Sequence, residues 1–148
     1  MIEYFPTNYV WNISTNIALG MGANPGEVDA ICRPLVEISK RGDDEGTEAF
    51  FKAWVAQADK LVSLADEDEA KGRTQSAGAK HGRAATYYIT AERMQHRDFA
   101  PRKAVYQKML DSFAKYNKLY AFDCERIDIP YQGKTLSALF VKVPGADK

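Results

Sequence analysis

The stretch TEAFFKAWVAQADKLVSLADEDEAKG, residues 47–72, decides the fold of this chain. Its apolar residues recur in steps of three and four, which places them on one face of a helix. These residues are Phe50, Trp54, Ala58, Leu61 and Ala65, and the stripe is widened by Phe51, Val55 and Val62. We expect the acidic run at residues 66–69 to face solvent and Gly72 to end the helix. The stretch therefore predicts one long amphipathic helix.

A second long helix is predicted from the residues that follow, as far as Gln95. Its apolar positions are mostly small, and they include Ala77, Ala84, Ala85, Tyr88, Ile89 and Ala91. Small side chains on one helix and large aromatic side chains on the other allow two helices to approach closely. A helical hairpin over residues 47–95 is therefore the unit on which we expect the rest of the chain to pack.

Shorter helices are predicted before this hairpin. Thr7 or Asn8 can cap a helix that runs to about Met21, because their side-chain oxygens accept free N–H groups of a first turn. The apolar face expected for this helix consists of Val10, Ile13, Ile17 and Met21, with Trp11 beside it. Another helix is expected over residues 27–39, with a break near Arg33, since Pro34 removes a backbone donor.

The sequence changes its period near the C-terminus. After Pro101 a helix is predicted to about residue 121, with Val105, Met109, Phe113, Tyr116 and Tyr120 on one face. Residues 125–129 then alternate between charged and apolar, which is typical of a half-buried strand. Residues 136–143 are more apolar, and we expect a strand buried on both faces. A two-stranded hairpin alone is marginally stable, so the pattern predicts a mainly α chain: a helical domain over residues 1–123 and the start of an incomplete second domain over residues 124–148.

Composition excludes several classes of function. The chain has 148 residues, with 20 basic and 20 acidic side chains, so its charge gives no support for binding to nucleic acid or an anionic membrane. No apolar run approaches the ~20 residues that span a bilayer. The first residues lack the basic and apolar regions of a secretory signal, and a cytoplasmic location is expected. Cys32 and Cys124 are therefore expected to be reduced thiols.

The sequence contains none of the common catalytic motifs. It has no G-x-S-x-G nucleophile elbow, no glycine-rich phosphate loop, no H-E-x-x-H and no C-x-x-C. No metal site and no cofactor are expected on this basis. His81 is interpreted as an exposed or locally hydrogen-bonded residue, and His96 as a charge near a helix end.

Aromatic residues offer a further clue. Nine of them could converge if the first helix packs on the hairpin: Tyr4, Phe5, Tyr9, Trp11, Phe50, Phe51, Trp54, Tyr87 and Tyr88. They form either an ordinary core or the apolar roof of a pocket for an aromatic or polyketide-like substrate. Tyr87 and Tyr88 point about 100° apart on a helix, so at most one is expected in the core. The candidate substrate-binding residues are Trp11, Trp54, Tyr87 and Tyr88.

Several segments in order resemble one enzyme family. They are YFPTNYVWN at residues 4–12, AWVAQAD at 53–59, SAG at 76–78, RAATYYITAE at 83–92 and CERIDIPYQGKTL at 124–136. They are similar to landmarks of the α/β-hydrolases that carry an N-terminal helical domain. That group includes dihydropseudooxynicotine hydrolase, fungal enzymes that shorten polyketide chains, and relatives of the fermentation–respiration switch protein.

The resemblance implies a role for each part of the chain. Residues 1–123 would be the cap that covers the active site and contributes to dimer contacts, and residues 124–143 would be the first two strands of the hydrolase sheet. The family's serine, acid and histidine lie beyond such a hairpin, so no catalytic residue is assigned here. The complete enzyme would hydrolyse a C–C or ester-type acyl bond of a small hydrophobic or aromatic substrate. The chain is then expected to be truncated or to work with a complementary catalytic chain.

Two other interpretations remain open. The chain could be a stand-alone helical binding module for a partner helix or a small hydrophobic ligand. Such a module should bury Leu136, Phe140 and Val141 on its own helices, whereas a cap should leave them exposed or paired with another chain. Alternatively, two hairpins could complete one sheet in a homodimer.

Overall fold

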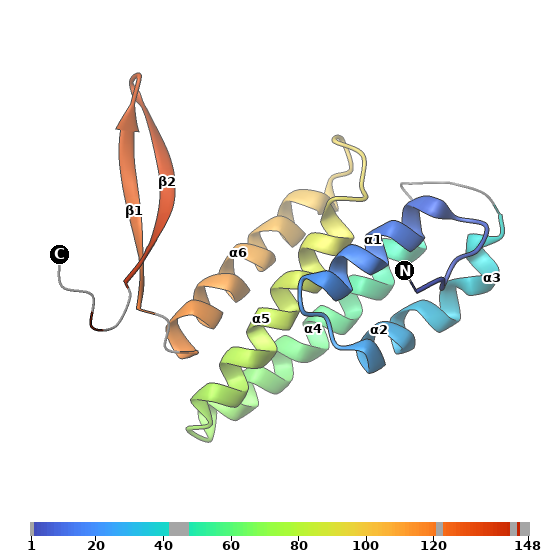
Figure 1. Cartoon of the computed structure of the whole chain (residues 1–148), viewed down its shortest axis with the longest axis horizontal. Coiled ribbons are helices and arrows are strands. Elements are labelled where there is room, and N and C mark those ends of the chain that lie inside the picture. Colours follow the sequence, from blue (N-terminus) through green and yellow to red (C-terminus); the bar gives the residue numbers. More distant parts are fainter. Residues whose placement is uncertain (1, 42–47, 121–122, 143–144, 146–148) are drawn as a thin grey trace.

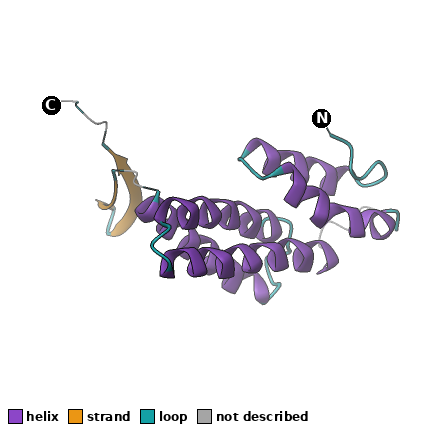
Figure 2. Cartoon of the chain, turned by 90° about the horizontal axis from the view of Figure 1, so that it is seen from below, coloured by secondary structure: helices purple, strands orange, loops and turns teal. Residues whose placement is uncertain are grey.

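The computed structural model of the chain describes residues 2–41, 48–120, 123–142 and 145. It is mainly helical and ends in an antiparallel hairpin, as the sequence predicts. Its elements are α1 (Tyr9–Gly20), α2 (Pro25–Cys32), the 3-10 turn η1 (Arg33–Leu35), α3 (Val36–Ser39), α4 (Glu48–Ala70), α5 (Thr74–Glu92), α6 (Pro101–Leu119), β1 (Cys124–Tyr131) and β2 (Lys134–Val141). Helices α4, α5 and α6 lie side by side, α1 and α2 cover one end of them, and the strands stand at the other end (Figures 1 and 2).

The α4–α5 hairpin forms as the sequence predicts. All five residues of the expected stripe on α4 are buried, and Gly72 takes a positive φ of 72° in the turn. The acidic run is not uniformly solvated, which corrects the expectation for it. Asp68 is buried and accepts hydrogen bonds from Ser76 and Lys80 of α5. The carboxylate of Asp68 therefore stabilises the turn between α4 and α5.

Helix α1 is capped by Asn8, whose side chain accepts from the N–H of Trp11 at 3.0 Å. The apolar face expected for this helix is wrong, because Ile17 and Met21 are 45% and 50% exposed. The buried face instead carries residues such as Trp11, Asn12, Ser14, Thr15 and Ala18. Its polar members are buried with their own hydrogen bonds: Asn12, for example, accepts from the N–H groups of Tyr4 and Phe5. Hydropathy alone does not reveal such a face.

The break at Pro34 is confirmed. The chain leaves α2 at Cys32, passes through one 3-10 turn and resumes as the short helix α3. Asn24 caps α2 by accepting from the N–H of Gly26 at 2.9 Å, and Pro25 occupies the first helical position, where a missing donor costs nothing. Cys32 is buried, and neither Cys32 nor Cys124 forms a disulfide.

Helix α6 packs on α5 where α5 has glycines. A Cβ atom added to Gly78 would lie 2.9 Å from the backbone nitrogen of Tyr120, and one added to Gly82 would lie 2.9 Å from the Tyr116 ring. The predicted apolar face of α6 is only partly covered. Val105 is buried, but Phe113 and Tyr120 are 37% and 41% exposed. Part of α6 therefore presents apolar surface that no described element covers.

The strands pair from Cys124 opposite Val141 to Tyr131 opposite Lys134. The turn between them uses Gln132 and Gly133, both with positive φ, as a type I′ hairpin turn requires. The expectation that the second strand is buried on both faces is wrong. Leu136, Phe140 and Val141 are 53%, 51% and 59% exposed, because no second sheet layer or helix lies over them among the described residues.

Among the described residues, no helix combines the length and the apolar character that crossing a bilayer requires.

Candidate functional site

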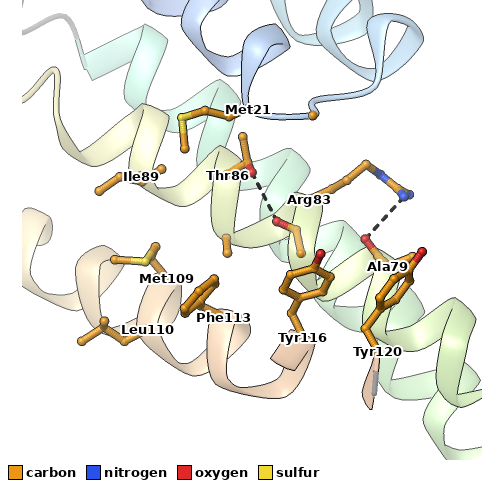
Figure 3. Close-up of a pocket in the computed structure, with 13 residues that line it drawn as sticks. Met21, Ala79, Arg83, Thr86, Ile89, Met109, Leu110, Phe113, Tyr116 and Tyr120 are labelled. Carbon is orange, nitrogen blue, oxygen red and sulfur yellow. Dashed lines mark hydrogen bonds between the residues drawn. The ribbon is translucent and has the colours of Figure 1, made fainter. Parts of the chain in front are cut away.

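A groove of about 740 Å³ lies between α5 and α6 and is closed at one side by Met21 and Gly22, which follow α1 (Figure 3). Its walls come from residues far apart in the sequence. They are Met21, Gly22, Ala79, Gly82, Arg83, Ala85, Thr86, Ile89, Met109, Leu110, Phe113, Tyr116 and Tyr120. Most of these side chains are apolar or aromatic. Such a surface favours an apolar or aromatic ligand over a charged one.

Glycine and alanine on α5 create the space. Ala79, Gly82 and Ala85 have little or no side chain, so the α5 wall is shallow. The rings and long side chains of α6 form the opposite wall. Figure 3 shows Met109, Leu110 and Phe113 along that wall. Thr86 is the polar residue facing them, and its hydroxyl donates to the Gly82 carbonyl at 3.3 Å. The hydroxyl is thus engaged within its own helix.

A hydrogen-bonded network holds the rim of the groove. Arg83 donates to Glu27 through Nε at 3.1 Å and through Nη2 at 3.2 Å, which is a bidentate pair. Tyr87 donates to the same carboxylate at 2.5 Å and accepts from the N–H of Asn24 at 3.1 Å. Burial, followed by the bond to Glu27, raises the pKa of Tyr87. The network joins α2 to α5, so it fixes the position of the α1–α2 end beside the groove.

A second hollow of about 600 Å³ lies between α6 and the hairpin. Its walls include Tyr106 and Asn117 of α6 with Arg126, Ser137 and Leu139 of the strands. Leu110 and Phe113 line both hollows. Helix α6 is therefore a shared apolar wall with an open surface on each side.

The candidate substrate-binding residues from the sequence lie in the core. The aromatic rings pack in a row. The distance between ring centroids is 5.1 Å for Trp11 and Phe50, 5.6 Å for Phe50 and Trp54, and 5.5 Å for Trp54 and Tyr87. Trp11, Trp54, Tyr87 and Tyr88 are at most 2% exposed, and none lines either hollow. The structure brings Trp11, Trp54 and Tyr87 together as packing. Their contact with a substrate stays a prediction.

The expectation that only one of Tyr87 and Tyr88 is in the core is wrong. Both are buried, because each hydroxyl finds a carboxylate on a neighbouring helix. Tyr88 donates to Asp59 of α4, and Lys108 of α6 donates to the same carboxylate while lying 5.7 Å from the centre of the Tyr88 ring. Burial, followed by the bond to Asp59, raises the pKa of Tyr88. Neither hydroxyl is free for a ligand.

Sequence reasoning did not identify the residues that line the groove. The sequence predicts Met109, Phe113, Tyr116 and Tyr120 on one face of a helix, but the pattern does not show what covers that face. The small residues Gly78 and Gly82 on the facing helix are the signal that marks a close crossing. On α6, the part of the apolar face that does not touch α5 at this crossing stays exposed, as Phe113 shows.

His81 also differs from its sequence interpretation. It is 1% exposed, and neither ring nitrogen has a hydrogen-bond partner among the described residues. Burial, followed by the nearby charge of Lys115, lowers the pKa of His81. Its Nε2 lies 3.8 Å from Oδ1 of Asp66, and with Glu69 these residues form the one group among the described residues whose ligand atoms could hold a metal. His96 is exposed and lies beyond the end of α5, as expected.

Comparison with known proteins gives similar sequences in fungi. The chain is 33% identical over 113 residues to the hydrolyase poxO of Penicillium oxalicum, covering 73% of this chain and 27% of that protein. It is 29% identical to the hydrolase LUC6 of a Fusarium species over 139 residues, 90% of this chain and 31% of that protein. It is 26% identical to the hydrolase acrC of Aspergillus aculeatus over 150 aligned positions, 98% of this chain and 33% of that protein.

The relationship rests on these individual proteins, because no protein-family model matches the chain. The chain spans 27% to 33% of the length of the curated relatives it matches. Its similarity to three fungal proteins that carry hydrolase or hydrolyase names indicates a relationship to the hydrolases.

Proposed function

We propose that this chain is the helical cap of an α/β-hydrolase and forms a wall of its substrate pocket. The nucleophile, acid and histidine of such an enzyme would lie outside these 148 residues. The reaction would be hydrolysis of a C–C or ester-type acyl bond, and the cap would exclude water and enclose the substrate. The groove between α5 and α6 would hold the apolar or aromatic part of that substrate.

The observation that carries the proposal is the exposed apolar face of the hairpin. Cross-strand partners share a face, so Ile127, Ile129, Leu136, Ala138 and Phe140 lie on one side of it. The second hollow is lined mainly from the other side, by Cys124, Arg126, Ser137 and Leu139. A self-sufficient binding module would bury its apolar hairpin face on its own helices. A hairpin that leaves that face open supports a further layer of the hydrolase domain that would pack on it.

The chemistry within the described residues agrees with a cap. A serine hydrolase needs a nucleophile and a histidine within hydrogen-bond reach. Among the described residues, His81 has no hydrogen-bond partner, and the His96 side chain accepts a hydrogen bond from the N–H of Asp98. Among the residues that the structure describes, no serine hydroxyl hydrogen-bonds to either ring. Dimer formation through the cap and a cytoplasmic location are further parts of this proposal.

The proposal is tested with 2-naphthyl acetate, an aryl ester whose hydrolysis releases fluorescent naphthol. The purified chain is expected to release naphthol no faster than buffer. It is also expected to bind the ester, and saturation-transfer NMR would detect contact with the naphthyl ring. Turnover that a serine reagent stops would contradict the proposal, since the chain would then hold its own nucleophile.

Variants localise the binding. Ile89→Asp places a carboxylate in the wall of the groove without touching the second hollow, and it is expected to abolish the NMR signal of the bound ring, because an ionised group makes the wall unfavourable for an apolar ligand. Ile129→Asp makes the same kind of change on an exposed apolar residue outside both hollows and should leave the signal unchanged. Equal signals in both variants would exclude the groove as the substrate wall.

A further inference from the structure

We propose that Asp66, Glu69 and His81 form a binding site for a divalent transition-metal ion such as Zn²⁺. Asp66 and Glu69 lie one turn apart on α4, and His81 is on α5 directly across from them. One ligand atom from each lies within 4.8 Å of the other two. A tetrahedral zinc site with three protein ligands and one water uses this mixture of imidazole and carboxylate groups.

The buried imidazole is the independent observation for this site. His81 is 1% exposed, and both ring nitrogens lack a hydrogen-bond partner among the described residues. Buried polar groups are nearly always satisfied, so an orphan ring needs an explanation. Its Nε2 lies 3.8 Å from a carboxylate oxygen of Asp66, which is too far for a hydrogen bond. A metal ion between the two groups would satisfy both.

The carboxylates can close around an ion. Zinc–ligand distances of about 2.0–2.2 Å require the three ligand atoms to come closer together than they are here. Asp66 and Glu69 have side chains that are 52% and 40% exposed, so they can change rotamer without disturbing the core. His81 supplies the fixed side of the site. The imidazole also favours transition metals over Mg²⁺ or Ca²⁺, which prefer oxygen ligands.

Lys115 of α6 would compete with a metal ion for the carboxylates of Asp66 and Glu69. Its Nζ lies 2.7 Å from Oδ1 of Asp66 and 3.3 Å from Oε2 of Glu69, so its ammonium pairs with both carboxylates and offsets one of their two negative charges. A bound metal would displace it, and the positive charge of the displaced ammonium would weaken metal binding. Replacing Lys115 with an uncharged residue of similar length should therefore strengthen metal binding, whereas a purely structural role for the cluster gives no such effect.

Sequence motifs do not reveal the site, because the ligands come from two helices. Asp66 and Glu69 are three residues apart, but His81 follows on the other arm of the hairpin, and no familiar ligand spacing results. The α4–α5 turn brings the two arms together. The site is distinct from the groove, since none of its three ligands lines either hollow.

The test is a calorimetric titration of the full chain with ZnCl₂. One Zn²⁺ per chain is expected, together with tighter binding, by at least tenfold, in Lys115→Met. Glu69→Gln and His81→Ala are expected to weaken binding at least tenfold. Glu67→Gln, an exposed carboxylate on the same helix, and His96→Ala are matched controls that should bind as the parent does.

Further readouts keep the test decisive. Co²⁺ in place of Zn²⁺ should give the visible absorption of a four-coordinate site in the parent and lose it in Glu69→Gln. Because loss of the buried ring in His81→Ala can disturb folding, Asp66→Asn and Glu69→Gln, which change exposed side chains, carry the same conclusion. The proposal is overturned if neither the parent nor Lys115→Met binds Zn²⁺, or if Glu69→Gln binds as tightly as Glu67→Gln.

Discussion

Cys32 and Cys124 have different environments, and this gives a prediction at the scale of single residues. Burial raises the pKa of the Cys32 thiol to about 12, and Thr15 lies 3.7 Å from its sulfur. Thiolate is the reactive form, so Cys32 should be inert at pH 8, whereas the half-buried Cys124 should react. Iodoacetamide treatment of the native chain, followed by peptide mass spectrometry, is expected to show alkylation of Cys124 alone.

The control for this prediction is the same reaction in denaturant, where both cysteines should be alkylated. The variant Cys124→Ser should then take up no label in the native state. Equal labelling of the two thiols in the native chain would mean that the α1–α2 packing around Cys32 opens readily.

The carboxyl group of Asp68 is expected to make the stability of the fold depend on pH. Hydrogen bonds from Lys80 and then Ser76 lower the pKa of Asp68 to about 2. The pKa of an unfolded-state aspartate is about 3.9. Because the folded pKa is the lower one, this carboxylate stabilises the fold above about pH 4, and the stabilisation is lost as the pH falls toward 2.

Asp68→Asn is therefore expected to melt at a lower temperature than the parent at pH 7. The difference in melting temperature should shrink as the pH falls from about 4 to about 2. Thermal denaturation in the presence of a chelator measures both effects, and Glu67→Gln, which changes an exposed neighbour, is the control. A difference that does not depend on pH would assign the effect to packing rather than to charge.

Polar residues are where the sequence was least informative. Asp68, Tyr88 and His81 are all buried, although their residue types favour exposure or a half-exposed position. Asp68 finds its partners across a turn, and Tyr88 finds Asp59 on the other arm of the hairpin. Such partners depend on how two helices are rotated against each other. A hydrophobic pattern fixes which face is buried, but it leaves open which polar side chains meet there.

The crossing of α5 and α6 gives a prediction at the scale of elements. Gly78→Ala adds a Cβ that would lie 2.9 Å from the backbone nitrogen of Tyr120. A backbone atom cannot move aside as a side-chain tip can, so α6 must shift. Alanine favours a helix over glycine by about 1 kcal/mol, and overpacking typically costs about 1–3 kcal/mol. We expect a net loss of stability in urea unfolding followed by far-UV circular dichroism.

Gly20→Ala is the matched control for this crossing. A Cβ at Gly20, the last residue of α1, meets nothing within 4 Å. Stability should stay within about 1 kcal/mol of the parent, because only the helix preference changes. A Gly78→Ala variant as stable as Gly20→Ala would show that α6 is not held tightly against α5.

Most elements could be predicted from the sequence because their signals are local. Asn8, Pro34 and Gly72 mark a start, a break and an end of helices, and the structure places a cap, a 3-10 turn and a positive φ at these residues. The groove could not be predicted in this way. Phe113 and Tyr120 belong to the expected apolar face of α6, but whether that face is covered depends on elements elsewhere in the chain.

At the scale of the whole molecule, the two ends differ. Helices α1 and α2 contribute Trp11, Ala18, Val28 and Ile31 to one buried cluster with α4 and α5, so that end has a closed core. The opposite end, formed by α6 and the hairpin, exposes large apolar residues that include Leu110, Phe113, Leu136 and Phe140. Exposed apolar surface of this extent marks an interaction site. Under the proposed function, this is the surface on which the rest of the hydrolase would pack.

This difference gives the last prediction: a chain truncated after Asp123 should keep its helices. Among the described residues, the hydrophobic core extends no further along the chain than Val105 and Met109 of α6, and the strand residues are half-buried or exposed. Changes to surface residues usually alter stability by no more than about 0.5 kcal/mol. Urea unfolding of residues 1–123 should therefore give nearly the parent's stability, and light scattering should show less aggregation, since the apolar hairpin is gone. Phe140→Lys in the full chain is the matched control, because it makes the same face polar and should reduce aggregation without changing stability. If truncation unfolds the helices while Phe140→Lys does not, the hairpin is an integral part of the helical domain, and its role as the start of another domain's sheet is wrong.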